Sequence, residues 1–175
     1  EPYGREINIA YNTGNKISSI TVPDGSPGGR VYSYTYLSSG YLGKVTYPDA
    51  SERNYEYVYA GIGYRLSGIK DEKGTYIEKH TYDTQGRALT SSADGTNERL
   101  TINYLDNTHT TVTDSLGHVT TYTIDKTMGK SHATDISGPG CKECGQGNIS
   151  KTYDDSLNVI SKTDANGNVT AMTYD

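Results

Sequence analysis

The sequence contains no tryptophan, no phenylalanine and only two cysteines among its 175 residues. Hydrophobic residues make up 33% of the chain, and the mean hydropathy is −0.71. This composition leaves too little apolar material for a thick globular interior and favours one sheet with a single buried face. No apolar run approaches the length of a transmembrane helix, so we expect no membrane span.

A basic stripe is also missing. The 16 lysines and arginines are scattered along the chain and are outnumbered by 21 aspartates and glutamates, which gives a net charge of −5. A protein that binds nucleic acid needs a basic footprint to neutralise phosphates. The absence of one excludes nucleic acid as a partner, and the acidity comes mostly from aspartates at predicted turns.

The sequence does contain a repeated pattern. Over residues 80–95 we expect a strand that ends at Tyr82, a turn from Asp83 to Gly86, a short strand through Leu89 and a second turn. The pattern returns over residues 152–167, and its period is roughly 23 residues, which is typical of stacked supersecondary units. The residues that close the first strand of each unit are Tyr11, Tyr36, Tyr59, Tyr82, Tyr104, Ile124, Tyr153 and Tyr174. The aspartates predicted at the second turn are Asp24, Asp49, Asp71, Asp94, Asp114, Asp135 and Asp164.

The residues before each landmark alternate between aromatic or aliphatic and polar. This period of two is typical of half-buried antiparallel strands. Stacked units would place tyrosines in a ladder across the sheet. The ladder comprises Tyr32, Tyr34, Tyr36, Tyr55, Tyr57, Tyr59, Tyr82 and Tyr104. These rings could form a surface on which sugars stack or the buried layer of the sheet, and their strict spacing favours the buried layer.

Two strands and two tight turns fill the period and leave no room for a helix. We therefore predict an all-β fold, a repeat array of antiparallel β-hairpins with almost no helix. Residues 1–175 form a single array of about seven units, and both ends are expected to fall in mid-repeat. The turn residues predicted with most detail are Asp83, Gly86, Asp94, Gly95, Asp164 and Gly167. Residues 164–168 also resemble half of a calcium loop, but the later acidic ligand is absent and turn chemistry explains them without a metal.

The loop insert at residues 139–147 interrupts the pattern and carries both cysteines, Cys141 and Cys144. The pair could form a small disulfide that clips a surface loop, remain as free thiols, or contribute to a metal site. A structural zinc site needs four ligands, and no second pair is present. The disulfide is the favoured interpretation, and no metal or other cofactor is predicted.

Catalytic signatures are missing. The four histidines, His80, His109, His118 and His132, fall at unrelated phases of the repeat. Neither a G-x-S-x-G elbow nor an H-E-x-x-H motif occurs, and carboxylates recur with the turns. We therefore predict that the chain is not an enzyme.

The motif Tyr-Asp-x-x-Gly-Arg-x-Leu from Tyr82 to Leu89, with the closing Asp-x-x-Gly, resembles the tyrosine–aspartate (YD) repeats of the Rhs family. Such repeats occur in bacterial Rhs toxins, wall-associated proteins and teneurins. The resemblance covers essentially the whole chain, although Leu157 stands where the family pattern has glycine. It implies a β-sheet strip that spirals into an open shell or a solenoid-like fibre, often around a C-terminal toxin. It carries over no catalytic residue.

The resemblance implies a structural role in an exported bacterial protein. The expected location is extracellular or the cell surface, where the chain would build a shell, a wall or a fibre. Its expected partners are neighbouring repeats or copies of itself, joined end to end. Two alternatives stay open: an adhesin module that binds cell-surface carbohydrate through exposed tyrosines, and the encapsulating shell of a toxin whose effector lies outside this segment.

Overall fold

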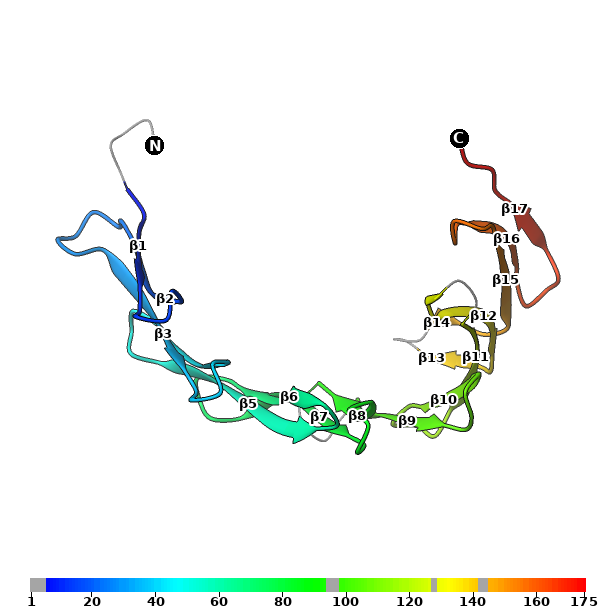
Figure 1. Cartoon of the computed structure of the whole chain (residues 1–175), viewed down its shortest axis with the longest axis horizontal. Helices are drawn as coiled ribbons and strands as arrows, with labels where there is room; N and C mark the ends of the chain where they lie inside the picture. Colours follow the sequence, from blue (N-terminus) through cyan, green and yellow to red (C-terminus); the bar gives the residue numbers. More distant parts are fainter. Residues whose placement is uncertain (1–5, 94–97, 127–128, 142–144) are drawn as a thin grey trace. The chain divides into compact units, whose positions relative to one another are not determined.

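The computed structural model describes residues 6–93, 98–126, 129–141 and 145–175 (Figure 1). The chain divides into two compact units. Unit 1 comprises residues 1–87 and 93–95, and unit 2 comprises residues 88–92 and 96–175. Each unit is described by itself.

The described residues of unit 1 form seven strands, and consecutive strands are hydrogen-bonded in antiparallel ladders. They are β1 (Asn8–Tyr11), β2 (Ile17–Val22), β3 (Arg30–Tyr36), β4 (Leu42–Thr46), β5 (Glu52–Ala60), β6 (Gly63–Lys70) and β7 (Tyr76–Tyr82). The predicted landmarks Tyr11, Tyr36 and Tyr82 each form the last residue of a strand. Tyr59 lies one residue before the end of β5.

Unit 2 continues the same antiparallel order. Its strands are β8 (Ala88–Ser92), β9 (Leu100–Tyr104), β10 (His109–Thr113), β11 (Val119–Asp125), β12 (His132–Ser137), β13 (Gly140–Cys141), β14 (Gly145–Gln146), β15 (Ile149–Tyr153), β16 (Val159–Thr163) and β17 (Val169–Ala171). Strand β12 pairs directly with β15, and the insert between them forms a separate two-stranded ribbon, β13–β14. The insert thus leaves the ladder without breaking it.

The prediction of an all-β fold is confirmed. Fifteen strands form one open antiparallel sheet in chain order, and the described residues contain no α-helix. No helix among them is therefore long and apolar enough to cross a bilayer.

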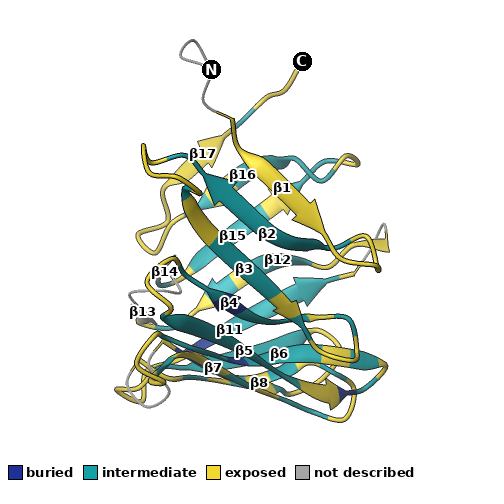
Figure 2. Ribbon diagram, turned by 90° about the vertical axis from the view of Figure 1, so that its left-hand side faces the viewer, coloured by how far each residue is buried: buried dark blue, intermediate teal, exposed yellow. Residues whose placement is uncertain are grey.

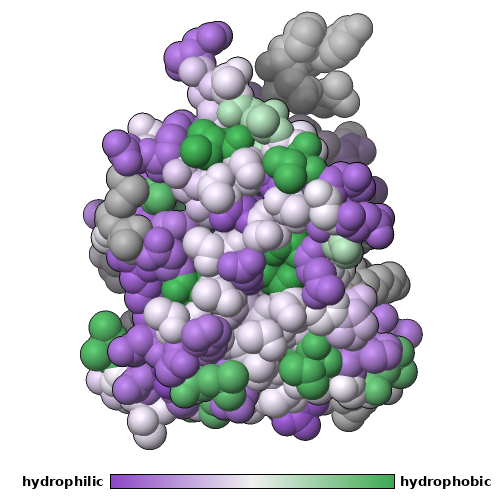
Figure 3. Space-filling model, turned by 90° about the vertical axis from the view of Figure 1, so that its right-hand side faces the viewer, coloured by the Kyte–Doolittle hydropathy of each residue, from purple (hydrophilic) through white to green (hydrophobic). Residues whose placement is uncertain are grey.

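Burial is shallow throughout, as Figure 2 shows by its scarcity of dark blue. Among the described residues, the only buried hydrophobic side chains are Val45 and Ala60, and the buried polar ones are Ser92 and Thr120. On the face shown in Figure 3, hydrophobic residues form separate spots among polar ones. Stability therefore comes from ladder hydrogen bonds and contacts between neighbouring strands more than from a central core.

The register in unit 1 places Tyr34 and Tyr55 on one face of the sheet and two lysine–glutamate ion pairs on the other. Tyr34 lies opposite Val45, and Val45 lies opposite Arg53 on the next strand. Tyr55 follows two residues after Arg53 and therefore shares this face. The other face carries the ion pairs Lys44–Glu52 and Lys70–Glu56, with N–O distances of 2.7 and 2.6 Å. The alternation read from the sequence thus corresponds to two different surfaces.

The turn after Tyr82 has the geometry expected from its residues. The Gly86 amide donates to the Asp83 carbonyl at 3.0 Å, and the Asp83 amide donates to the Arg87 carbonyl at 2.9 Å. One carboxylate oxygen of Asp83 accepts the Gln85 and Arg87 amides, both at 2.9 Å. Gly86 closes the turn at φ 78°, a left-handed conformation that glycine adopts without a steric penalty. The same hydrogen bonds recur at Asp71, Asp114, Asp154 and Asp164. In the Asp154 turn the left-handed position is occupied by Leu157, at φ 65°, instead of glycine.

Three predicted turn aspartates differ from this arrangement. The Asp24 carboxylate accepts the Ser26 amide at 3.0 Å, but the backbone turn bond there runs from the Gly29 amide to the Ser26 carbonyl. Asp135 lies inside β12, opposite Thr123 and Ser150, so its assignment to a turn was wrong. Asp49 does form part of a turn, but it stands two residues after Tyr47, which occupies the first position. The predicted turn residues Asp94 and Gly95 lie outside the described residues.

Candidate functional sites

The most regular side-chain feature is a hydrogen bond from a tyrosine hydroxyl to the backbone of the preceding strand. In five hairpins the phenol donates to a carbonyl that is 15 to 20 residues earlier in the chain. The pairs are Tyr36 with Ile17 at 2.9 Å, Tyr82 with Leu66 at 2.6 Å, Tyr104 with Ala88 at 3.0 Å, Tyr153 with Ala133 at 2.6 Å, and Tyr174 with Val159 at 2.9 Å. We call this contact the tyrosine latch.

A bulge accompanies the latches of Tyr36 and Tyr153. Between Thr35 and Tyr36 the register with β4 shifts, so that Gly43 is an extra residue on β4. Equivalent shifts occur before Tyr11, Tyr57, Ile124 and Tyr153. A bulge bends the strand and increases its twist. The Tyr36 hydroxyl thus bonds to β2, while the Tyr36 backbone pairs with Leu42 of β4, next to the bulge.

The ladder predicted from sequence divides into two classes in the structure. Tyr36, Tyr82 and Tyr104 are half-buried and donate latch hydrogen bonds. The other five tyrosines form no latch. Tyr32, Tyr34, Tyr55 and Tyr57 are half-buried, and Tyr59 is 64% exposed. Sequence reasoning missed the latch because alternation reports which face a ring occupies and gives no information about its hydroxyl. The recurrence of tyrosine at strand ends was the available signal.

A shallow hollow of about 690 Å³ lies in unit 1, and we call it the aromatic groove. Its walls include the rings of Tyr32 and Tyr47, which meet edge to face with centroids 6.1 Å apart. The carboxylates that line it are Asp24, Asp49 and Glu72. Aromatic faces beside hydrogen-bonding groups are the usual means by which a protein surface holds an amphipathic ligand.

The carboxylates of the aromatic groove accept hydrogen bonds from neighbouring side chains and amides. Hydrogen bonds from the Ser26 hydroxyl and amide, with help from Arg30, lower the pKa of Asp24, and those of Ser51 lower the pKa of Asp49. Beside the groove, Arg53 donates to Glu72 at 2.8 Å. Its Nε is buried and has no hydrogen-bond partner among the described residues. The carboxylates of Asp24 and Asp49 therefore stay ionised at neutral pH.

A second polar cluster occupies the other face of unit 1. The Tyr76 hydroxyl and the Lys70 ammonium donate to the two oxygens of Glu56, at 2.7 and 2.6 Å. The Lys70 and Tyr76 hydrogen bonds lower the pKa of Glu56. Lys70 and Lys79 lie 4.6 and 4.7 Å from the centroid of the Tyr76 ring. The ring also covers Gly68, where a Cβ would approach it to 2.8 Å, so the cluster fixes the register of three strands.

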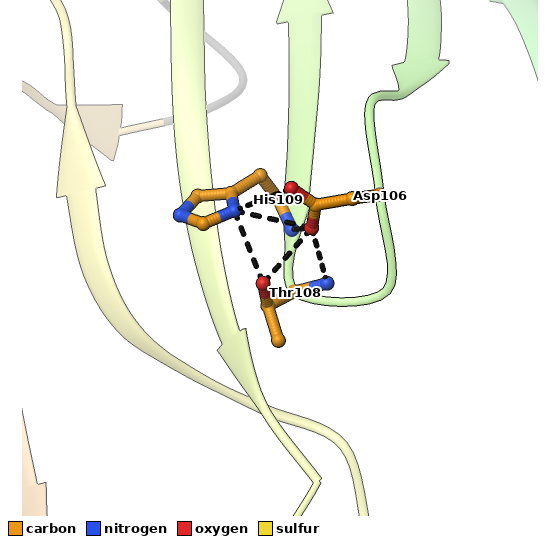
Figure 4. A network of polar contacts seen from close by, with 3 residues as sticks. All are labelled: Asp106, Thr108 and His109. Carbon is orange, nitrogen blue, oxygen red and sulfur yellow. Dashed lines mark hydrogen bonds and ion pairs between the residues drawn. The ribbon is translucent and has the colours of Figure 1, made fainter.

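Figure 4 shows a histidine, a hydroxyl and a carboxylate that together resemble a catalytic arrangement. Asp106 accepts from the Thr108 amide at 2.6 Å, from its hydroxyl at 2.9 Å and from the His109 amide at 2.8 Å. These bonds, led by the Thr108 amide, lower the pKa of Asp106 well below its usual range. His109 Nδ1 lies 2.9 Å from the other carboxylate oxygen. Asp106 and Thr108 are exposed and His109 is half-buried. All three lie at one hairpin turn, so the network caps that turn.

The other three histidines are also beside carboxylates. His80 lies 3.4 Å from Glu78, His118 lies 3.0 Å from Asp114, and His132 lies 3.8 Å from Asp125. Within the described ranges no three metal-binding side chains come together.

The cysteine prediction falls largely outside the described part of the chain. The backbone of Cys141 belongs to β13, opposite Gly145, whereas Cys144 lies outside the described residues. The disulfide stays a prediction. Gly138, which precedes this ribbon, packs against Thr120 so closely that a Cβ would meet the Val119 carbonyl at 2.5 Å.

Comparison with models of known protein families gives no match to this chain, and comparison with curated proteins also gives none.

Proposed function

We propose that this chain is a structural segment of an exported bacterial protein of the Rhs type, in which hairpins add to one another to build a shell, a wall or a fibre. The observation that carries the proposal is the tyrosine latch, which recurs in both units of a sheet with almost no core. Each latch joins one hairpin to the strand before it. Stability in such an arrangement accumulates from nearest-neighbour contacts along the sheet.

The proposal extends to a spiralling sheet, as the resemblance to YD repeats implies. Bulges favour this arrangement because each adds a local bend and extra twist to its strand. They recur in both units, at Thr35–Tyr36 and at Thr152–Tyr153 for example. A spiral of this kind could serve as the shell around an effector outside this segment.

The location can be tested in the native source. Antibodies raised against this chain should label intact cells, and protease added outside the cells should remove the label. Labelling that requires permeabilised cells would contradict the export of the protein and its role in a wall or surface fibre.

End-to-end joining is a separate part of the proposal. Strands β1 and β17 form the two edges of the described sheet, and all their residues are exposed. Edge strands present unpaired backbone groups to which another strand can add. Light scattering over a range of protein concentrations should show oligomers that Ile9→Lys and Val169→Lys suppress. A monomer at high concentration would rule out joining by these edges.

The aromatic groove favours a second candidate function, the binding of carbohydrate. Tyr32 and Tyr47 offer rings against which a sugar face can pack, and the carboxyl groups of Asp49 and Glu72 can accept hydrogen bonds from sugar hydroxyls. A glycan panel should give binding that Tyr47→Ala abolishes and that Tyr11→Ala, an exposed tyrosine outside the groove, leaves unchanged. No binding across the panel, or equal loss in both variants, would contradict this function.

A further inference from the structure

Four tyrosines in unit 1 form a continuous chain of ring contacts, which we call the tyrosine cluster. Tyr41 contacts Tyr57 at a centroid distance of 5.0 Å and Tyr64 at 5.8 Å, and Tyr64 contacts Tyr59 at 5.4 Å. Tyr57 and Tyr59 belong to β5 and Tyr64 to β6, while Tyr41 immediately precedes β4. Two neighbouring strands and the residue before β4 thus contribute rings to one place.

The hydroxyls of the tyrosine cluster differ from those of the latches. None of the four donates a hydrogen bond to another described residue, whereas Tyr36 and Tyr82 are bound to carbonyls. Three of the four are accessible to solvent, with exposures of 42% for Tyr41, 64% for Tyr59 and 42% for Tyr64. The latch does not explain why phenols rather than phenyl rings occupy these positions.

Free phenols in ring contact are suited to oxidative coupling. The chain has no tryptophan, so tyrosine is its most easily oxidised aromatic residue. A one-electron oxidant removes a hydrogen atom from a phenolic O–H and leaves a radical that is delocalised onto the ring carbons beside the oxygen. Two such radicals held side by side combine faster than radicals that must meet by diffusion, because the fold has already brought the rings together.

We propose that the tyrosine cluster is a site of oxidative modification, at which a dityrosine bond forms between Tyr41 and Tyr57. This pair has the shortest centroid distance of the cluster and the most nearly parallel rings, with an interplanar angle of 31°. Val45 lies opposite Arg53 and Lys44 lies opposite Asn54, and the same register continued toward the start of β4 places Tyr41 opposite Tyr57. The link would join neighbouring strands covalently.

The reaction balances with peroxide as the oxidant. Each of the two phenols gives up one electron and one proton to a peroxidase that uses hydrogen peroxide. The radicals form one carbon–carbon bond between the positions next to the hydroxyls. The two hydrogens displaced from these carbons move to the oxygens and restore both phenols. The protein loses two hydrogens in total, and one hydrogen peroxide is reduced to two waters.

The proposal is independent of the wall role and of carbohydrate binding, since it depends only on the geometry of the cluster. The test treats the dilute folded chain with a haem peroxidase and hydrogen peroxide. We expect blue dityrosine fluorescence in a monomer whose mass has fallen by two hydrogens. Digestion should release a cross-linked peptide that contains Tyr41 and Tyr57.

Variants make the assignment specific. Tyr41→Phe keeps the ring and removes the phenol, and it should reduce the intramolecular product by roughly tenfold or more. Tyr57→Phe should do the same and serves as the second variant if the first does not fold. Tyr11→Phe, which alters a tyrosine that is 60% exposed outside the cluster, should leave the yield unchanged. Equal yields in all variants, a link between other tyrosines, or products that are only intermolecular dimers would overturn the proposal.

Discussion

Removing a single hydroxyl from a tyrosine latch tests how much the latch stabilises the sheet. Tyr82 is the most suitable position, because its hydroxyl donates to the Leu66 carbonyl at 2.6 Å, one of the two shortest latch bonds. Tyr82→Phe keeps the ring and its packing and removes only this donor. Burial raises the pKa of Tyr82, so the phenol remains a neutral donor at physiological pH.

The expected loss follows from the partial burial of the site. A neutral hydrogen bond contributes about 0.5–1.5 kcal/mol net, and water can partly replace the donor at a half-buried carbonyl. We therefore expect Tyr82→Phe to lower the free energy of unfolding by about 1 kcal/mol, which corresponds to a fall in Tm of about 2–4 °C for a chain of this size. Tyr153→Phe, in unit 2, should cost a similar amount, and the two losses should add.

Urea denaturation monitored by far-UV circular dichroism gives the free-energy differences directly, provided that the m-value is unchanged. Tyr59→Phe is the matched control, because Tyr59 is 64% exposed and donates no hydrogen bond to the described residues. The free energy of unfolding of the Tyr59→Phe variant should equal that of the wild type. If Tyr82→Phe and Tyr59→Phe behaved alike, the latch would contribute nothing and its recurrence would need another explanation.

Three further predictions concern the turns and the glycine beneath Tyr76. Ala50→Gly should raise the free energy of unfolding by about 0.5–1 kcal/mol in urea titrations, because Ala50 is held at φ 66°; a loss would contradict the assigned turn. Gly68→Ala should cost about 1–3 kcal/mol through its 2.8 Å approach to the Tyr76 ring, and the cost should shrink in a Tyr76→Ala background. In the folded chain the pKa of Asp83 is lowered chiefly by the hydrogen bond from the Arg87 backbone amide, and the pKa of Asp106 chiefly by that from the Thr108 amide. Both carboxylates therefore stabilise the fold above about pH 4, and this stabilisation should be lost as the solution is acidified toward the lowered pKa values. Thermal melts at successive pH values should therefore show a falling Tm below about pH 4, and a Tm that stayed constant to about pH 2 would contradict this.

The strands and most turns could be predicted because local sequence dictates them. Tyr82 ends its strand where Asp83 and Gly86 supply the groups that a tight turn requires, and no distant contact is needed to specify that arrangement. Asp135 shows the limit of this reasoning. The same residue type occurs where a turn was expected, but pairing with Thr123 and Ser150 continues the strand through it.

The bulges and the aromatic groove could not be predicted from alternation. A bulge adds one residue to one strand. The alternation of apolar and polar residues does not indicate which residue is the extra one, and Gly43 of β4 is an example. The groove depends on Tyr32 and Tyr47 meeting across strands, and the hydroxyl partners of the latches likewise depend on register. These contacts join residues 15 or more positions apart, so only the assembled sheet defines them.

The most direct test of the structural role is the mass of the intact, denatured polypeptide isolated from its native source. The proposal of a segment within a long Rhs-type wall or shell protein predicts a mass far above 19.0 kDa, the mass of these 175 residues. Such a value would direct attention to the rest of the protein and to what its sheet encloses. A mass near 19.0 kDa would contradict the proposal that this sheet is one segment of a larger shell.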